Sequence, residues 1–560
     1  MKKIKNIALV SALALAMGSC GDFGDLNNNP ESLNEGNVPY AMLFSNAQSQ
    51  ALGSDWDMWR TGCIYSSQFV QQLVSINWWP YYTRYEYSDG YSGSFWDTYN
   101  SDRGAMRDVT TCYDKWQSEE GMELDWNICR VMRVLAFSDM TDLYGDIPYS
   151  QAGRPSEYPY PEYDTQESIY KSMLAELDEA QANLSSGTAK MGAADLYYQG
   201  DAASWKKLAN SLMLRLAMRL VKVDATTAQQ YAAKAVANGV FTSNDDNARL
   251  EREGAVTSND SCDPFAKIIA HEDREFFITD VFVNMLKSTN DPRLSLIATI
   301  APQGTDSSTG LGNGQSTDIQ NNSDGVWHSA DYGDMSFDAQ EGMKTGGYGL
   351  TSDKYWIGNV DDRFNDATFK ANHAAYFSTP NRCTYADPTG PTYIVTYAQT
   401  KLLMAEAAQR GWISGTAKTY YEDAVKAHFN QYSQYPNSSA AIKVAFPDGA
   451  DAAAAAYLAE NPFDASKALE QINTQYYIIC FGDPYEVFAN WRRSGYPVLT
   501  PAVMAQQDAL SGTAKDGFSI PRRFIYPTTE SQVNTTNYDA AVARLANGDT
   551  FYSRVWWDAK

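Results

Sequence analysis

The sequence lacks the short motifs that most enzymes of this length carry. Its 560 residues contain no phosphate-binding Walker loop, no G-x-S-x-G turn and no H-E-x-x-H pair. Histidine, the side chain that most often acts as a base or binds a metal near neutral pH, is rare. The four histidines are His271, His328, His373 and His428, which are far apart in the sequence. These absences favour a protein that binds over one that catalyses.

Positive charge is also scarce, because 44 Lys and Arg face 68 Asp and Glu, a net charge of -24. A surface this acidic repels phosphate backbones, so we expect no nucleic-acid partner. The acidic stretch from Ser243 to Asn247 lacks the Gly and the distal Glu of an EF-hand loop and is interpreted as a solvated turn. No cofactor is predicted, and a structural calcium ion is left open.

Cysteine forms no C-x-x-C pair, so zinc and redox motifs have no support. One of the seven cysteines, Cys20, belongs to the N-terminal segment. The others are Cys63, Cys112, Cys129, Cys262, Cys383 and Cys480. We expect most of them to be buried as small apolar side chains, and their pairing is left open.

The chain has one apolar run, from Ile7 to Met17, behind a basic start. It is shorter than the ~20 residues that span a bilayer and is typical of a signal peptide, predicted as residues 1–19. The following Cys20 resembles the lipidated cysteine of bacterial lipoproteins, although Met17 stands where their motif usually has Leu. The alternative is simple cleavage, with Cys20 in a coil. Residues 20–36 are predicted as a flexible tether to the outer membrane.

Helical spacing dominates beyond the tether. Apolar residues recur every three or four positions, the spacing of one helix face, at Trp205, Leu208, Ala209, Leu212, Leu216 and Leu220. A second helix follows, with Ala228, Ala232 and Ala235 at 0, +4 and +7. Small residues at this spacing let two helices approach closely, as in tetratricopeptide-type repeats.

A similar pair occurs later in the chain. Residues 393–411 are predicted as a helix that stops at Gly411, and Ala417, Tyr421 and Ala424 repeat the small-residue spacing. Three further helices are predicted at Ser168–Leu184, Leu124–Tyr144 and Ala468–Phe481. The sequence therefore predicts a mostly α-helical fold of paired helices.

Two stretches, about 70–100 and 300–395, are rich in Gly, Asn, Ser and aromatics and show no sustained periodicity. Segments of this length are more often functional loops than linkers. We therefore predict one domain over residues 37–560, a helical scaffold that carries long aromatic loops.

Aromatic residues are concentrated between Asn77 and Tyr91, where seven rings follow neither helical nor strand spacing. They either fill a local core or form a binding platform, because Tyr and Trp suit both roles. On the second interpretation the centre of the ligand site is Trp78, Trp79, Tyr81, Tyr82 and Tyr85, with Asn77 and Arg84 as the polar complement. Weaker candidates from other loop stretches are Trp96, Trp327, Tyr355 and Trp356. No catalytic or metal-binding residue is predicted.

Several strings resemble the SusD/RagB family of nutrient-binding outer-membrane lipoproteins, in the order in which they occur there. They are LAFSDMTDLYGDIPYSQA (135–152), NDPRL (290–294), LLMAEAAQRGW (402–412), EVFANWRRSGYP (486–497) and IPRRFIYPTTESQVN (520–534). The resemblance implies tetratricopeptide-like helical pairs under a loop-rich face, and a SusC-like TonB-dependent barrel as partner. It implies capture of a glycan at the cell exterior without turnover.

The most conspicuous of these motifs have structural interpretations of their own. Asp146 is expected to hydrogen-bond backbone beside a helix end. Arg492 and Arg493 are expected to pair with carboxylates such as Glu486 rather than with ligand, and Arg522 and Arg523 likewise.

Three alternatives to glycan capture stay open. A peptide-binding lipoprotein would use the same rings against apolar side chains. A scaffold would use them only against the barrel. A secreted glycoside hydrolase would need two carboxylates, which 68 acidic residues cannot exclude.

Overall fold

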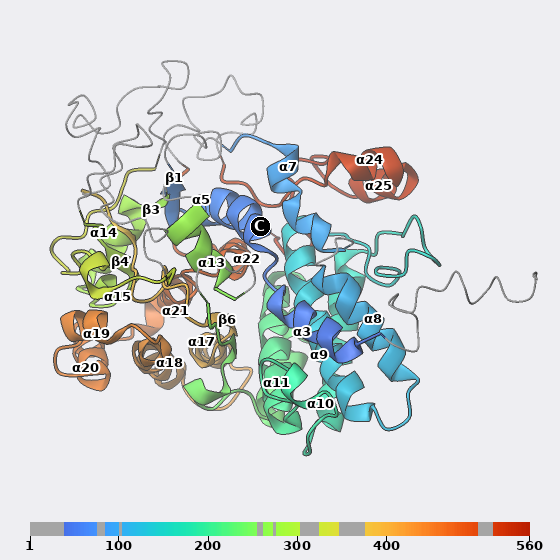
Figure 1. Cartoon of the computed structure of the whole chain (residues 1–560), viewed down its shortest axis with the longest axis horizontal. Helices are drawn as coiled ribbons and strands as arrows, with labels where there is room; N and C mark the ends of the chain where they lie inside the picture. The colour runs from blue at the N-terminus through green and yellow to red at the C-terminus, as the bar shows by residue number, and fades with distance from the viewer. Residues whose placement is uncertain are drawn as a thin grey trace, which may run out of the picture.

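The computed structural model describes residues 38–75, 85–99, 104–254, 261–272, 276–302, 324–345, 376–501 and 519–559. Within these residues helices predominate (Figure 1). The longer helices are α3 (Tyr40–Ser49), α8 (Ala105–Gln117), α9 (Glu123–Tyr144), α10 (Gln166–Asn183), α11 (Ala202–Arg219), α12 (Ala225–Asn238), α14 (Asp280–Ser288), α17 (Tyr397–Gln409), α18 (Ala417–Gln431), α20 (Ala450–Glu460), α21 (Ala468–Ile479), α22 (Pro484–Ser494) and α25 (Thr535–Val542).

Shorter elements connect these helices. The helical ones are α4 (Asp55–Asp57), the π-helix η1 (Met58–Ser66), α5 (Ser67–Phe69), α7 (Asp89–Ser92), the 3-10 helix η2 (Ser94–Tyr99), η5 (Asn244–Asp246), α13 (Pro264–Lys267), α15 (Leu294–Ile297), α19 (Ser439–Ala445) and α24 (Thr528–Val533). Six short strands form three antiparallel pairs: β1 (Leu73–Ser75) with β3 (Phe276–Ile278), β2 (Ala248–Leu250) with β6 (Thr392–Val395), and β4 (Ala298–Thr299) with β5 (Thr379–Pro380).

The helices predicted from spacing are confirmed, and side-chain caps explain where several of them begin. Asp201 accepts a hydrogen bond from the Ser204 amide at the start of α11, and Asp224 does the same for the Thr227 amide at α12. One boundary was wrong. Residues 393–395 belong to strand β6, and α17 begins at Tyr397, because a Thr396 capping box sets that start.

Neighbouring helices pack in sequence order, and α11 joins the two halves. The first half consists of α3 and α8–α12, and the second consists of α17–α22 (Figure 1). In α12 the predicted stripe of Ala228, Ala232 and Ala235 is fully buried against α11. Small side chains permit this close approach, which confirms helical pairs of the tetratricopeptide type.

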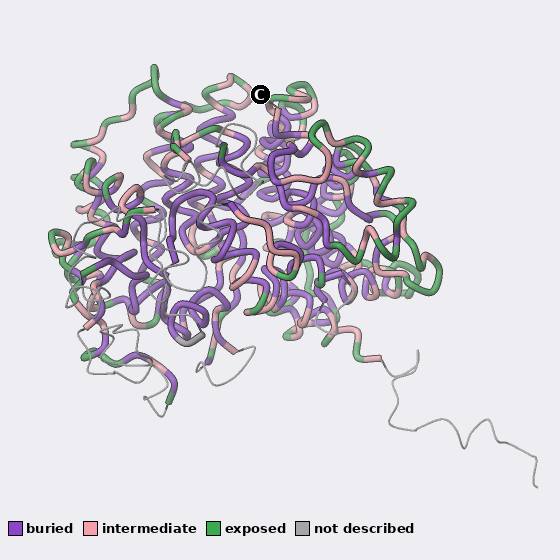
Figure 2. The backbone as a smooth tube through the Cα atoms, turned by 90° about the horizontal axis from the view of Figure 1, so that it is seen from above, coloured by how far each residue is buried: buried purple, intermediate pink, exposed green. Residues whose placement is uncertain are grey.

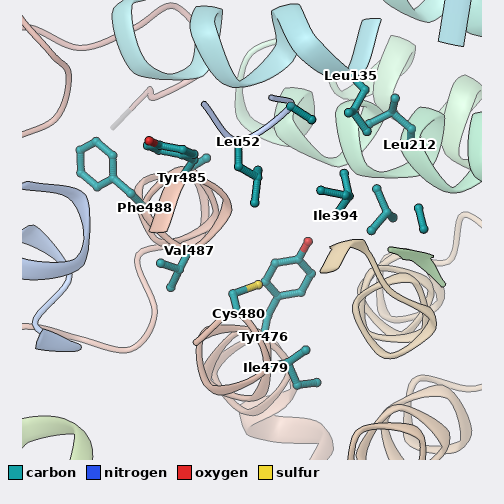
Figure 3. Packing of buried hydrophobic residues seen from close by; sticks show 14 of the residues in the cluster. Leu52, Leu135, Leu212, Ile394, Tyr476, Ile479, Cys480, Tyr485, Val487 and Phe488 are labelled. Atoms are coloured by element: carbon teal, nitrogen blue, oxygen red, sulfur yellow. The ribbon is translucent and has the colours of Figure 1, made fainter. Parts of the chain in front are cut away.

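One hydrophobic core cluster runs through both halves. Figure 3 shows part of it, with the buried side chains Leu135 of α9, Leu212 of α11, and Tyr476 and Ile479 of α21. In Figure 2 the buried residues lie in the interior of the molecule, whereas the exposed residues lie on its outer turns. The six described cysteines are buried, which confirms the expectation that most of them are small buried side chains.

The arginines have the structural role that was predicted, but the expected partner was wrong for Arg493 and for Arg492. Arg493 binds Glu406 of α17 with two hydrogen bonds of 2.9 and 2.8 Å, whereas Glu486 is bound by Arg219 of α11. Arg492 forms no ion pair with a carboxylate among the described residues; it donates to backbone carbonyls, and its guanidinium lies 4.0 Å from the Phe488 ring centroid. Sequence could not choose these partners because they come from distant helices.

The remaining structural expectations are confirmed. Arg522 pairs with Asp558, and Arg523 pairs with Asp549. Asp146 accepts a 2.8 Å hydrogen bond from the Gln166 amide. The acidic stretch at η5 is a capped turn in which Asp246 binds Lys207 at 2.7 Å. In the part of the chain that the structure describes, no helix combines the length and apolar character of a membrane span.

Candidate functional site

Three chain segments meet where β1 begins. β1 pairs with β3 from Leu73↔Ile278 to Ser75↔Phe276. The Met343 amide donates to the Ile278 carbonyl at 2.9 Å, and the Asp280 amide donates to the Met343 carbonyl at 3.0 Å. Residues near 73, 278 and 343 are therefore fixed side by side by backbone hydrogen bonds.

A pocket of about 280 Å³ opens at this junction, and we name it the β1–β3 pocket. It is lined by Gln71, Asp280, Val281, Lys344, Thr345, Val498, Leu499, Thr500 and Pro501. Gln71 donates to the Thr500 carbonyl, which ties the 498–501 segment to β1. Val498 is 81% exposed, so the rim presents apolar surface to solvent.

The pocket also carries opposite charges. Partial burial raises the pKa of Asp280, and the nearby Lys344 opposes that rise. A pocket with apolar walls, one acid, one base and one side-chain amide suits a neutral polar ligand.

Eight of the predicted ligand-binding residues, and the predicted lipidation site Cys20, lie outside the described residues. The eight are Asn77, Trp78, Trp79, Tyr81, Tyr82, Arg84, Tyr355 and Trp356. In the sequence, residues 346–375, which contain Tyr355 and Trp356, follow the pocket residue Thr345 directly.

Three described candidates lie in the interior, so their assignment as exposed ligand contacts is corrected. Tyr85 is fully buried and packs edge-on against Phe69 with 5.8 Å between ring centroids. Trp327 is 5% exposed, donates to the Ala386 carbonyl at 2.9 Å and lies 4.1 Å from the Arg382 guanidinium. Large rings with one satisfied polar group are typical core residues.

Trp96 is also largely buried, at 6% exposure. Its ring stacks on Tyr163, and its Nε1–H donates to Glu530 at 3.3 Å. For these three rings the core-filling alternative therefore holds.

A partly exposed cluster of rings is formed by residues that precede and follow the segment 76–84 in the sequence. We name it the Trp56 cluster: Trp56 of α4, Trp59 and Arg60 of η1, and Tyr91 of α7. Adjacent rings meet edge to face, at 5.4 Å for Trp56–Trp59 and 5.6 Å for Trp59–Tyr91. Trp56 is 55% exposed.

The Arg60 guanidinium lies among these rings, with its Cζ 5.0 Å from the Trp56 centroid, 5.9 Å from Trp59 and 5.5 Å from Tyr91. The buried Arg60 Nε–H has no hydrogen-bond partner among the residues that the structure describes. Cation–π contacts hold the charge in place while the outer indole face stays accessible. Such a surface can stack on the C–H face of a sugar ring, and Arg can donate to its hydroxyls.

Sequence reasoning missed the Trp56 cluster. Trp56 and Trp59 are three residues apart, and Cys63 continues the same helix face, a spacing that indicates a buried stripe. Only the tertiary structure shows that this stripe leaves the core at Trp56.

Comparison with known proteins identifies relatives. Residues 30–527 match the family model SusD-like_2, described as starch-binding and associating with the outer membrane. Comparison with curated protein sequences finds no match.

Solved structures share the fold. A chitin-binding protein is 28% identical, with a TM-score of 0.73 over 93% of this chain and 100% of that one. A SusD-like protein from Bacteroidetes is 25% identical, with a TM-score of 0.73 over the same shares of the two chains. A chitin-binding SusD homologue from Flavobacterium johnsoniae is 24% identical, with a TM-score of 0.68 over 93% of this chain and 98% of that one, and shows the fold alone.

Proposed function

Because the chain belongs to the SusD-like family of starch-binding proteins that associate with the outer membrane, we propose that it captures glycans at the cell surface. The observation that carries this proposal is the Trp56 cluster, an accessible indole beside a fixed guanidinium. The β1–β3 pocket supports it, because apolar walls with one acid, one base and one side-chain amide suit a neutral polar ligand.

We further propose that the captured glycan is released unchanged. The described residues contain no group of three or more His, Cys, Asp or Glu placed to hold a metal. The Trp56 cluster offers ring faces and a cation, and neither group can act as the acid of a glycosidase. Stacking and hydrogen bonding give reversible capture.

Delivery requires a position at the membrane and a transporter. We propose that lipid on Cys20 anchors the chain to the outer membrane, facing the exterior, and that a SusC-like TonB-dependent barrel receives the glycan. Residues 20–36 supply the tether between the lipid and the helical body.

The glycan class follows from the relatives. The family is described as starch-binding, and the 28% identical structure is of a chitin-binding protein, so α-linked glucose and β-linked N-acetylglucosamine oligomers are the ligands to test first. A peptide ligand of the same rings is the competing outcome.

Isothermal titration with maltohexaose, chitohexaose and a mixed peptide library tests the proposal. Trp56→Ala, Trp78→Ala and Trp79→Ala should each weaken glycan binding by about thirtyfold if the ring is an anchor worth ~2 kcal/mol. Trp412→Ala, a half-buried ring in the turn after α17, is the matched control and should bind like the wild type.

Binding of peptide alone would replace the glycan proposal with the peptide alternative. Unchanged glycan affinity in all three variants would return the rings to a structural role. Release of reducing ends from the oligosaccharides would favour a hydrolase.

A further inference from the structure

A second pocket lies between the loop after α9 and helix α24, at the edge of the molecule where Figure 1 shows α24 and α25. It has a volume of about 150 Å³ and is lined by four prolines together with Trp96, Tyr99, Gln151 and Glu530. We name it the proline pocket. It shares no lining residue with the β1–β3 pocket or the Trp56 cluster.

The size of the proline pocket limits its occupant. An engineered protein cavity of about 150 Å³ holds benzene, so the space suits one six-membered ring. Pockets for larger ligands are about 300–1,000 Å³, so an oligosaccharide would not fit whole. Proline walls carry no N–H donors, so hydrogen bonding depends on a few side chains.

Glu530 supplies acceptors at the floor of the pocket. Its Oε1 accepts from Trp96 Nε1–H at 3.3 Å, and its Oε2 accepts from the Tyr163 hydroxyl at 2.6 Å. A carboxylate has about four acceptor positions, so two remain for a ligand. The two protein donors also hold the carboxylate in one orientation.

Gln151 supplies the donor. Its Oε1 accepts from the Glu162 amide at 2.9 Å, and its NH₂ group makes no hydrogen bond to any residue that the structure describes. Arg154 does not compete as a donor, because Asp114 and the Ser150 carbonyl occupy it. The pocket thus offers acceptors, one donor group and aromatic carbon around the space of one ring.

We propose that the proline pocket binds a single terminal sugar ring of a glycan, as a subsite separate from the Trp56 cluster. Neighbouring hydroxyls of a pyranose donate to Glu530 and accept from Gln151, while its C–H groups contact the half-buried Tyr158 ring and the proline rings that line the pocket. The choice of a sugar as the ligand rests on the proposed function. The shape and polar groups of the pocket are independent of that function.

Ligand-observed NMR with glucose and N-acetylglucosamine tests the proposal on the full mature chain. Val533 lines the pocket and is 65% exposed, so Val533→Trp should fill the space without disturbing the core. It should weaken monosaccharide binding by about tenfold or more. Val444→Trp on α19, where the side chain is 45% exposed, is the control and should bind normally.

A second variant tests the donor. Gln151→Glu retains an oxygen for the Glu162 amide but replaces the NH₂ donor with an acceptor, so binding should weaken while the melting temperature stays close to that of the wild type. Trp78→Ala should leave monosaccharide binding in this pocket intact.

The outcomes separate the two proposals. Monosaccharide binding that Val533→Trp leaves unchanged overturns the proline-pocket proposal and spares glycan capture. No monosaccharide binding by the wild type overturns the proline-pocket proposal, whereas glycan capture fails only if the hexaoses also do not bind. Loss of co-purifying barrel from Val533→Trp, with sugar binding intact, overturns the sugar ligand in favour of a partner side chain.

Discussion

Buried arginines bind together helices that are far apart in the sequence. Arg219 of α11 pairs with Asp142 of α9 and Glu486 of α22, and Arg493 of α22 pairs with Glu406 of α17, and every one of these side chains is at most 5% exposed. A buried pair need not add stability over an apolar one, but removal of one partner leaves an uncompensated charge.

The Arg493–Glu406 pair gives the first prediction. Burial alone would raise the pKa of Glu406, but Arg493 and Arg410 outweigh it and lower the pKa to about 2. Arg493→Met should lower the free energy of unfolding by about 3–5 kcal/mol, because the carboxylate stays buried without its partner. Denaturant unfolding at pH 7 measures this loss.

Arg410 provides the control for that experiment. It contacts the same carboxylate, but its side chain is 28% exposed, so Arg410→Met should cost about 1 kcal/mol or less. Equal losses in the two variants would contradict the argument. The contribution of Glu406 is present above its unfolded pKa of about 4.5 and is lost as the pH falls toward 2.

For Asp483 we predict the opposite dependence of stability on pH. Burial, followed by the charge of Glu486, raises the pKa of Asp483 to about 7. Between about pH 4 and pH 7 the folded protein retains a proton that the unfolded chain releases, so this group makes stability fall as the pH rises. Asp483→Asn should therefore raise the free energy of unfolding at pH 8. The effect of the substitution should be more favourable at pH 8 than at pH 4 by on the order of 1–3 kcal/mol.

Asparagine can keep the cap that Asp483 provides to the Glu486 amide at the start of α22. The control is Asp224→Asn at the cap of α12, where hydrogen bonds from Thr227 lower the pKa of the acid. That variant should lose stability at pH 8. A loss in Asp483→Asn at pH 8 would contradict the assigned sign.

At the level of elements, the junction of β1, β3 and residues 342–343 supports the β1–β3 pocket. A Cβ added at Gly342 would lie 2.3 Å from the Thr279 carbonyl oxygen and 2.4 Å from the Asp280 backbone. Contacts this short force two backbones apart, so only glycine fits between these segments.

Gly342→Ala should therefore disturb this junction and weaken glycan binding through the pocket. We expect a loss of about 1–3 kcal/mol in the free energy of unfolding, the cost of overpacking, together with weaker binding by titration. The control is Gly90→Ala in α7, where nothing lies within 4 Å of the added Cβ, so stability should be kept or slightly raised. Equal behaviour of the two variants would contradict the role of Gly342.

In the described part of the molecule, helices form one continuous body. Packing of α11 against α17 joins the two helical halves. This arrangement leaves the Trp56 cluster and the two pockets on the outside, where a membrane-tethered protein could meet glycans.

The tether gives the prediction at this scale. Cys20→Ser should move the protein from the membrane fraction to the soluble fraction in the native host, because a lipid chain no longer holds it. Met17→Leu, which restores the usual lipoprotein residue, should stay in the membrane fraction. Retention of Cys20→Ser in membranes would contradict lipidation at this cysteine.

The sequence alone determined the helices and their pairing. Apolar and alanine spacing within one helix, as in Trp205–Leu220 and Ala228–Ala235, is a local property, so it predicts helix position and the face that packs. Burial of the cysteines and the structural role of the arginines also follow from residue chemistry.

Only the tertiary structure decided which aromatic rings are accessible and which charges pair. Tyr85, Trp96 and Trp327 are as aromatic as Trp56, yet they are buried while Trp56 is not, because segments distant in the chain cover them. Likewise Arg493 meets Glu406 rather than Glu486 through the packing of α17 against α21 and α22. Exposure and ion pairing depend on long-range contacts, which a local pattern of residues does not encode.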